Sequence, residues 1–357
     1  MIRTTGVVLF LIGQGQFPGH FTSGLITTEL RGSQRFKPSP FHSLTLSPSH
    51  IIVSPSHPLT LSPSQALTVR RLPTNPIITP QTDATIGTNI NGPSLIRVPS
   101  WIKKPLGKYY LYFADHNGKY IRLAYSNKIE GPWKVYAAGT LHLSQSFFSD
   151  HIASPEVVVD EPTHKVRLYF HGLTPSEGAQ HTRVAISSDG INFDAVQEPV
   201  GRGSAYWRLF RYDGWWYALT MPGRLYRSRD GLTPFEAGPQ LFDRSVSQVH
   251  NAVMVRGDKL DVFFTRAGDT PERIVYSQVK LGPDWKDWTP GPAQECLSPQ
   301  ERWEGGDLPL TPGRIGALDK PIRALRDPAL FQENGKTYLL YAVAGESGIA
   351  IAEVMLP

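Results

Sequence analysis

Hydrophobic residues recur along residues 85–355 in short runs that are separated by tight polar turns and grouped in threes. The third run of each group reads Arg-x-x-x-Ser in four groups and has a shortened echo in the fifth; these runs are Arg122–Ser126, Arg183–Ser187, Arg224–Ser228, Arg273–Ser277 and Gly348–Ala352. Self-similarity at intervals of roughly 40 to 50 residues, built from short strands, is typical of a β-propeller. The repeat therefore predicts an all-β fold, a five-bladed β-propeller.

The first and second runs of each group also align. The second runs follow turn signals such as Asp213-Gly214 and Asn334-Gly335, which allow the positive φ values of hairpins. They are Tyr109–Phe113, Val166–Phe170, Trp215–Leu219, Leu260–Phe264 and Thr337–Tyr341. The first runs, which we expect to be the innermost strands, are Ser94–Val98, Glu156–Asp160, Tyr206–Arg211, Asn251–Val255 and Pro328–Gln332. No long helical period competes with this interpretation.

Composition supports one large domain over residues 76–357. Of the 357 residues, 40% are hydrophobic and 11% aromatic, which is enough for a buried core, and 32 glycines and 31 prolines fit many turns. The net charge of +5 is scattered along the chain, so we expect no nucleic-acid partner. No stretch has the length of a membrane-spanning helix, so we expect no integral membrane protein. The single Cys296 excludes an intramolecular disulfide and lies outside any metal-ligand spacing.

Residues 1–75 differ in kind from the rest. The octamer His42–Ser49 returns almost unchanged as His57–Ser64, within a tract rich in Ser, Pro and Thr that has no strand or helix period. We expect this segment to lack regular structure, or the natural protein to begin near residue 70. The apolar run from Gly6 to Gly13 behind Arg3 is similar to the core of a signal peptide, which favours an extracellular or periplasmic location, but no usual cleavage site follows.

The blade alignment predicts where chemistry is located. The first and second strands of a blade run antiparallel, so the start of the first and the end of the second emerge on the same face of the disc. We expect the starts of the innermost strands to surround a central channel. The residues at these starts are Gly92-Pro93-Ser94, Ser154-Pro155-Glu156, Ala205-Tyr206-Trp207, Val249-His250-Asn251 and Arg326-Asp327-Pro328.

These entries to the innermost strands, with hairpins of the Gly-Lys-Tyr-Tyr-Leu-Tyr type, resemble the glycoside hydrolases of family 43 and their five-bladed relatives in families 32, 68, 117 and 130. The resemblance covers about residues 85–355. It implies a glycosidase that acts on an oligosaccharide or polysaccharide by carboxylate acid/base catalysis, without a cofactor. In that pattern a carboxylate comes from the first blade, an Asp from the second and an acid Glu from a later blade.

The chain departs from this pattern at its expected carboxylates. Gly92 stands where the first-blade Asp would be, Glu156 replaces the second-blade Asp, and the third-blade entry offers no Glu. The fifth blade instead carries Arg326-Asp327-Pro328, which resembles the Arg-Asp-Pro motif of the invertase-like relatives. Hydrolysis needs two carboxyl groups that flank one bond. We therefore predict Glu156 and Asp327 as the catalytic pair; the structural alternative is that Asp327 caps its turn while Glu156 satisfies backbone donors.

Other polar residues complete the predicted site. Glu304 lies in the long loop at about 280–325 and is the candidate for a missing catalytic acid, with an exposed loop carboxylate as the alternative. We predict contacts with sugar hydroxyls for residues on the same face, although each also fits a structural role: Asp115, His116, His171, Tyr206, His250 and Arg326. No His-x-x-x-His-like spacing supports a metal site.

Arginines suggest the charge of the substrate. Arg122, Arg183, Arg224 and Arg273 begin equivalent third runs, and Arg266 and Arg326 lie near the same face. If several of them point inward, the pocket favours a uronic or sulfated sugar, because guanidinium groups match carboxylate and sulfate oxygens. The alternative is that each pairs with acidic residues of a neighbouring blade.

Two other functions stay open from the sequence. Gly92 in the usual carboxylate position fits a carbohydrate-binding propeller without catalysis, and the arginines and histidines fit a phosphate-dependent glycoside phosphorylase. The sugar, its linkage and the oligomeric state are left undetermined.

Overall fold

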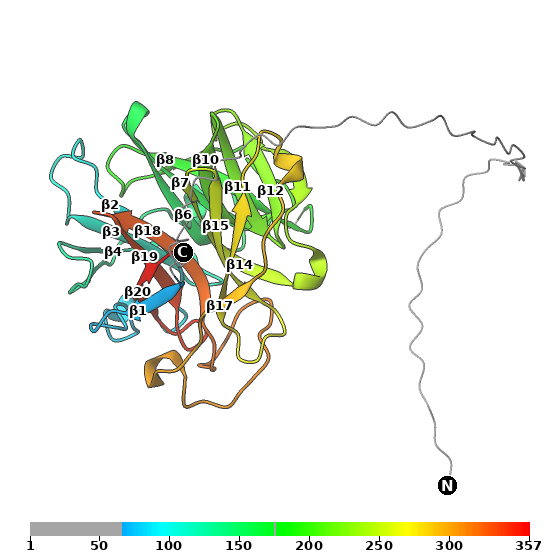
Figure 1. Cartoon of the computed structure of the whole chain (residues 1–357). Helices are drawn as coiled ribbons and strands as arrows, with labels where there is room; N and C mark the ends of the chain where they lie inside the picture. The colour runs from blue at the N-terminus through cyan, green and yellow to red at the C-terminus, as the bar shows by residue number, and fades with distance from the viewer. Residues whose placement is uncertain (1–65, 175) are drawn as a thin grey trace, which may run out of the picture. The chain divides into compact units, whose positions relative to one another are not determined.

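The computed structural model describes residues 66–174 and 176–357, which form five four-stranded antiparallel sheets (Figure 1). The sheets follow one another along the chain as the blades of a propeller, which confirms the predicted fold. Blade one holds β2 (Asn91–Arg97), β3 (Tyr109–Ala114), β4 (Arg122–Ser126) and β5 (Lys134–Tyr136). Blade two holds β6 (Ala153–Asp160), β7 (Lys165–Thr174), β8 (Ala179–Ser187) and β9 (Asp194–Ala195).

The remaining blades have the same order of strands. Blade three holds β10 (Ala205–Tyr212), β11 (Trp215–Met221), β12 (Arg224–Ser228) and β13 (Glu236–Gln240). Blade four holds β14 (Gln248–Arg256), β15 (Lys259–Arg266), β16 (Ile274–Lys280) and β17 (Gln294–Leu297). Blade five holds β18 (Arg326–Glu333), β19 (Lys336–Ala342), β20 (Ile349–Met355) and, as its outermost strand, β1 (Thr68–Arg71).

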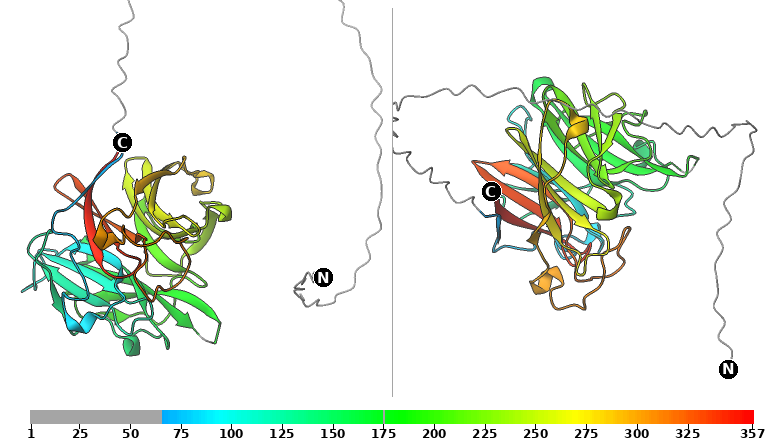
Figure 2. Two further views of the ribbon diagram at one scale, coloured as in Figure 1. Left: turned by 90° about the horizontal axis from the view of Figure 1, so that it is seen from below. Right: turned by 45° about the vertical axis from the view of Figure 1, so that its right-hand side comes forward.

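Strand β1 closes the ring. It pairs with β20 in antiparallel register, with Thr68 opposite Met355 and Arg71 opposite Ala352, and Figure 2 shows the two strands side by side. The propeller therefore includes residues before the predicted boundary at residue 76. The prediction for residues 1–65 lies outside the described residues.

Between residues 66 and 357, leaving out residue 175, helical structure is limited to single 3-10 turns in the connecting loops. These turns are η1 (Ala84–Ile86), η2 (Leu143–Gln145), η3 (Glu161–Thr163), η4 (Arg244–Val246), η5 (Trp285–Asp287) and η6 (Arg302–Glu304). Within the described part of the chain, none of the helices is long and apolar enough to cross a membrane.

Alternation along the second strands builds a core at every seam between blades. Tyr109, Leu111 and Phe113 of β3 pack toward blade five, whereas Tyr110 and Tyr112 pack toward blade two. Each of the other second strands is shared in the same way between two of the hydrophobic clusters. Because both faces of these strands are buried, their sequences are mostly hydrophobic, with buried Arg167 and Asp261 as exceptions, and each fully buried apolar side chain contributes about 1.5–3 kcal/mol.

The innermost strands contact one another around the centre, where β2, β6, β10, β14 and β18 meet their neighbours. Each of these strands is irregular directly after its first residue, where the pairing with the second strand shifts register. Such β-bulges redirect side chains and are enriched near active sites. They set the direction of every residue that faces the channel.

Candidate active site

The bulge turns the second residue of four innermost strands into the left-handed region of the backbone. Its φ value is 57° at Gly92, 47° at Ser154, 56° at Tyr206 and 48° at Asp327. A non-glycine residue in this conformation costs of order 1–3 kcal/mol and is held by the surrounding structure. Asp327 thus occupies in blade five the position that Gly92 occupies in blade one, so the carboxylate missing from blade one is present at the equivalent position of another blade.

Asp327 lies in a cluster of aromatic and imidazole rings that we call the channel mouth: Asp327, Tyr206, His116, His171 and His250. Nε2 of His250 lies 3.4 Å from Oδ1 of Asp327. The Tyr206 ring lies 4.7 Å from that of His171 and 5.0 Å from that of His250, and its hydroxyl is 3.5 Å from Nε2 of His116. The structure therefore brings together five of the residues that the sequence predicts for the site.

The electrostatics of the channel mouth are set by burial. Asp327 is only 4% exposed, and burial, with the nearby charge of Glu346, raises its pKa to about 6. Burial also lowers the pKa of His171 and of His250 well below the usual value, so both imidazoles are neutral near pH 7. Near pH 6 the Asp327 carboxyl can therefore either donate or accept a proton.

Arg326 lies beneath the mouth and is fully buried. It donates from Nε to Oε2 of Glu272 at 2.9 Å and from Nη1 to Oε1 of Glu346 at 2.7 Å. It also donates to the carbonyls of Gly316 and Arg314, which hold the loop before β18 in place. These partners occupy the guanidinium, so Arg326 positions a loop and two carboxylates and does not present a free fork to a substrate.

Two carboxylates of this network are absent from the predicted site. Burial raises the pKa of Glu272 to about 7, against the opposing charge of Arg326. Glu346 has a lowered pKa: burial raises it, but the hydrogen bond with His116 and the charge of Arg326 outweigh burial. Glu346 follows a second strand on the predicted face, which is the signal that identifies it, whereas Glu272 lies in a loop with no motif.

Glu346 also fixes His116 and Asn89. Its Oε1 is 3.3 Å from Nδ1 of His116, and its Oε2 accepts from Nδ2 of Asn89 at 2.7 Å. This contact raises the pKa of His116 although burial opposes it, so the imidazole favours its protonated form. Its second nitrogen, Nε2, faces the hydroxyl of Tyr206.

Glu156 belongs to the channel interior, which we define as Glu156 and Arg208. Its Oε2 accepts from Nη1 of Arg208 at 2.7 Å, and its Oε1 accepts from the backbone N–H of Leu209 at 3.2 Å. Both oxygens are therefore engaged. The predicted pairing of Glu156 with Asp327 as two free carboxylates is not what the structure presents, and the alternative role in satisfying a backbone donor accounts for Glu156.

Arg208 joins all five blades from the centre of the channel interior. Its guanidinium donates to four backbone carbonyls at 3.0–3.2 Å, one from each of the other innermost strands: Pro93, Pro155, Asn251 and Pro328. With Glu156 as its counter-charge, this buried cation is fully hydrogen-bonded. The sequence alone did not predict this role, because an arginine in the middle of a hydrophobic strand carries no motif.

Glu304 lies outside the channel mouth, at the junction of β1, β19 and the long loop. It is fully buried and accepts from Nε of Arg71 at 2.8 Å, from the Tyr341 hydroxyl at 3.0 Å and from the backbone N–H groups of Gln300 and Glu301. A carboxylate with this many donors stabilises the closing strand, so it does not supply the missing catalytic acid.

The third-strand arginines do not converge. Arg122 donates to the carbonyls of Asn89 and Ala114, and to Asp115 at 3.3 Å. The others bind local groups as well: Arg183 the carbonyl of Gln197, Arg224 the carbonyl of Gly238, Arg273 the carboxylates of Asp269 and Glu295, and Arg266 the carboxylate of Asp269. Each of these partners belongs to the arginine's own blade, so neither an inward ring of arginines nor pairing with acidic residues of a neighbouring blade is what the structure presents.

Two cavities of different size open on this face. The cavity beside Asp327 measures only about 10 Å³, close to the space of one water molecule, and Ser154, Tyr206 and His250 share its lining. A wider pocket of about 490 Å³ lies where blades one and five meet. Among the described residues, no group of three or more His, Cys, Asp or Glu side chains is arranged to hold a metal ion.

Solved structures with the same architecture are glycoside hydrolases. A thermostable family-43 glycoside hydrolase superimposes with a TM-score of 0.54 and 14% identity, over 75% of this chain and 89% of that one. The GH43_1 enzyme from Xanthomonas citri, complexed with xylotriose, gives a TM-score of 0.51 and 13% identity over 75% of this chain and 87% of its own. The described residues thus share the five-bladed propeller fold of these structures.

A sequence relative defines the family more narrowly. The chain is 38% identical over 327 residues to the uncharacterized protein R118 of Acanthamoeba polyphaga mimivirus, across 81% of this chain and 90% of that protein. It belongs to the same family as protein R118. No family model matches the sequence.

Proposed function

We propose that this chain is a glycosidase that hydrolyses an oligosaccharide or polysaccharide, with Asp327 as its acid/base carboxyl. One observation carries the proposal: a buried carboxyl with a pKa of about 6 stands at the strained entry of an innermost strand, beside neutral imidazoles and with no arginine neutralising it directly. Strained residues and raised carboxyl pKa values both concentrate at functional sites. The family 43 architecture of its structural neighbours supports the same class of reaction.

In the proposed reaction, water replaces the sugar's leaving group at the anomeric carbon. Asp327, in its ionised form, accepts a proton from a water molecule in the adjacent cavity of about 10 Å³. The water oxygen then bonds to the anomeric carbon as the glycosidic C–O bond breaks. The leaving oxygen takes a proton from His116, whose pKa is raised by Glu346. Both proton-transfer groups then regain their starting states by exchange with solvent.

A panel of neutral, uronic and sulfated oligosaccharides tests this proposal with the full-length chain. We expect Asp327→Asn to lower kcat at least 100-fold, because general acid/base groups contribute about 10²–10⁴-fold. Asp194→Asn on the outer strand β9 is the matched control and should retain wild-type activity. The assay is run with and without inorganic phosphate, since turnover that requires phosphate would indicate a phosphorylase. Equal activity of Asp327→Asn and wild type would contradict the role of Asp327.

A second candidate function is glycan binding without turnover. It is favoured by the engagement of the other central carboxylates, because Glu156 is paired with Arg208 and Glu346 with Arg326. Calorimetry with the same panel separates the two functions: binding without product release supports the second. The glycosidase proposal does not require an anionic sugar, since the arginines that suggested one are bound locally.

A further inference from the structure

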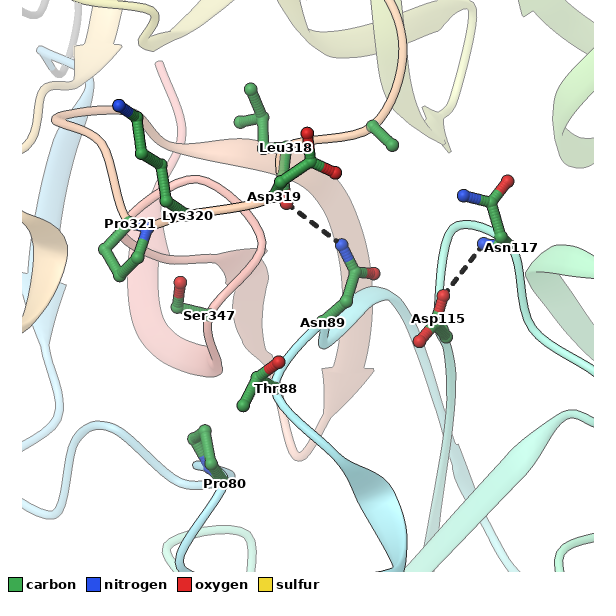
Figure 3. A pocket seen from close by; sticks show the side chains of 11 residues that line it. Pro80, Thr88, Asn89, Asp115, Asn117, Leu318, Asp319, Lys320, Pro321 and Ser347 are labelled. Carbon is green, nitrogen blue, oxygen red and sulfur yellow. Dashed lines mark hydrogen bonds between the residues drawn. The ribbon is translucent and has the colours of Figure 1, made fainter.

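A pocket of about 490 Å³, which we call the rim pocket, lies on the same face as the channel mouth, where blade one meets blade five (Figure 3). Its polar lining consists of Thr88, Asn89, Asp115, Asn117, Asp319, Lys320 and Ser347. Functional small-molecule pockets measure about 300–1,000 Å³, so the rim pocket has the size of a ligand site while the cavity beside Asp327 does not.

Asn89 forms a shared wall between the rim pocket and the channel mouth. Its side-chain N–H donates to Oε2 of Glu346 at 2.7 Å and to the carbonyl of Leu318 at 3.3 Å, and its oxygen accepts from the backbone N–H of His116 at 2.8 Å. His116 in turn faces Tyr206. The floor of the rim pocket is therefore fixed by the same network that orients the channel mouth.

The chemistry of the rim pocket fits hydroxyl groups. Figure 3 shows Asn117 and Asp115 on one side and Asp319 and Ser347 on others, around the same space. Amides, hydroxyls and carboxylates of this kind hydrogen-bond a polyol, and Pro80, Leu318 and Pro321 add apolar surface for the C–H face of a sugar ring.

The rim pocket offers no excess positive charge to an acidic ligand. Its lining contains two carboxylates, Asp115 and Asp319, and one ammonium group, Lys320. Arg122 lies behind the wall and is paired with Asp115 at 3.3 Å, so it offers no free cation to a ligand. A carboxylate or sulfate placed here would meet Asp319 without an unpaired arginine, whereas a neutral hydroxyl group could accept from Lys320 and donate to Asp319.

We propose that the rim pocket is a subsite for a neutral sugar unit, so that the glycan runs from the junction of blades one and five to the channel mouth. This inference rests on the proposed function for the class of ligand and extends it to the charge and length of the substrate. Asn117 and Asp319 are the contacts with the sugar, because both are exposed to the pocket.

Calorimetry with neutral oligosaccharides of increasing length tests the subsite without requiring turnover. We expect Asn117→Ala and Asp319→Ala each to weaken binding of the longer sugars about tenfold, with little effect on a monosaccharide glycoside. Asp258→Ala, an exposed turn residue elsewhere in the chain, is the matched control. The matching uronic oligosaccharides should bind at least tenfold more weakly than the neutral ones.

The outcomes separate the subsite from the reaction. Length-dependent binding that needs Asn117 and Asp319 supports the subsite even if no sugar is hydrolysed, in which case only the proposed hydrolysis fails. Binding or hydrolysis that is equally strong in both variants at every length overturns the subsite while leaving the reaction intact. Tighter binding of uronic than of neutral sugars also overturns it.

Discussion

The channel interior and the channel mouth each contain one of the two carboxylates predicted to act together. The two regions give these carboxylates different surroundings. Glu156 in the interior is engaged at both oxygens, by Arg208 and by the backbone of Leu209. Asp327 in the mouth faces a neutral His250, and its pKa is raised by burial. The first environment stabilises a fixed charge, whereas the second leaves a carboxyl that can exchange its proton.

A difference of two positions within the innermost strand accounts for this contrast. Asp327 is the second residue of β18 and takes the left-handed turn of the bulge, whereas Glu156 is the fourth residue of β6 and lies beyond the bulge of its own strand. Glu156 is therefore equivalent to Ser94, Arg208 and Asn251, which bond to neighbouring innermost strands. Position relative to the bulge, more than residue type, separates a fully paired carboxylate from one with a raised pKa in this ring.

The largest effect is expected from breaking the channel interior with Arg208→Met. This change leaves four carbonyls and the Glu156 carboxylate without their shared donor, so we expect a loss of about 3–5 kcal/mol in the free energy of unfolding. Denaturant titration measures it. The exposed Arg202→Ala is the control and should cost no more than about 0.5 kcal/mol. A loss below about 1 kcal/mol for Arg208→Met would remove the argument that Arg208 ties the blades together.

The next largest effect is expected in the channel mouth, where the stability of the Asp327→Asn variant should depend on pH differently from that of wild type. The folded pKa of Asp327 is raised to about 6 from 3.8, so its contribution to stability is complete below the unfolded pKa and is lost as the pH rises through 6. The Asp327→Asn variant has no carboxyl at this position, so it does not lose this stability as the pH rises. Its stability relative to wild type should therefore increase by about 3 kcal/mol between pH 3 and pH 8.

Unfolding midpoints at several pH values measure this change. Ser154→Ala, which lines the same cavity without a titrating group, is the control, and its difference from wild type should be constant with pH. A pH-independent difference for Asp327→Asn would show that its folded pKa is close to the ordinary value.

The smallest effect on stability is expected from adding a methyl group at the bulge position Gly92. Gly92 has a φ of 57°, and an added Cβ would lie 3.2 Å from the Cα of Ser154, whereas Gly203 has a φ of 61° and open space around its Cβ position. Both alanine variants bear the left-handed strain of about 1–2 kcal/mol, and only Gly92→Ala adds a backbone contact. We expect Gly92→Ala to be less stable than Gly203→Ala by about 1 kcal/mol in thermal unfolding. Equal stabilities would mean that the ring positions have room to adjust.

Much of the fold follows from local sequence. The three inner strands of each blade can be recognised by mostly hydrophobic runs and hairpin turns, because both faces of these strands are packed against neighbours. The fourth strands do not: β9 is Asp194–Ala195 and β1 is Thr68–Arg71, which are short, exposed at alternate positions and outside any repeat. They are identified only by their pairing in the structure, β9 with the preceding strand β8 and β1 with the distant strand β20.

The site is predictable to the level of neighbourhood but not of contact. Blade alignment places Asp327, Tyr206 and His250 around one centre because strand starts must share a face, and the structure brings them together. The blade alignment cannot show which carboxylate Arg208 contacts, since side-chain direction at a bulge depends on a single φ value. Residues in irregular loops, such as Glu272, have no periodicity that places them.

The pairing of β1 with β20 has a consequence for protein synthesis. The ribosome makes β1 before any complete blade and β20 after all the other strands of the propeller, so the ring cannot close until β20 has been made. During that interval β1 has an unpaired edge, and the apolar residues that later fill the seams of blade five are uncovered. Elongation rate and chaperone access during the last strands should therefore govern the yield of folded protein more than events at any earlier blade.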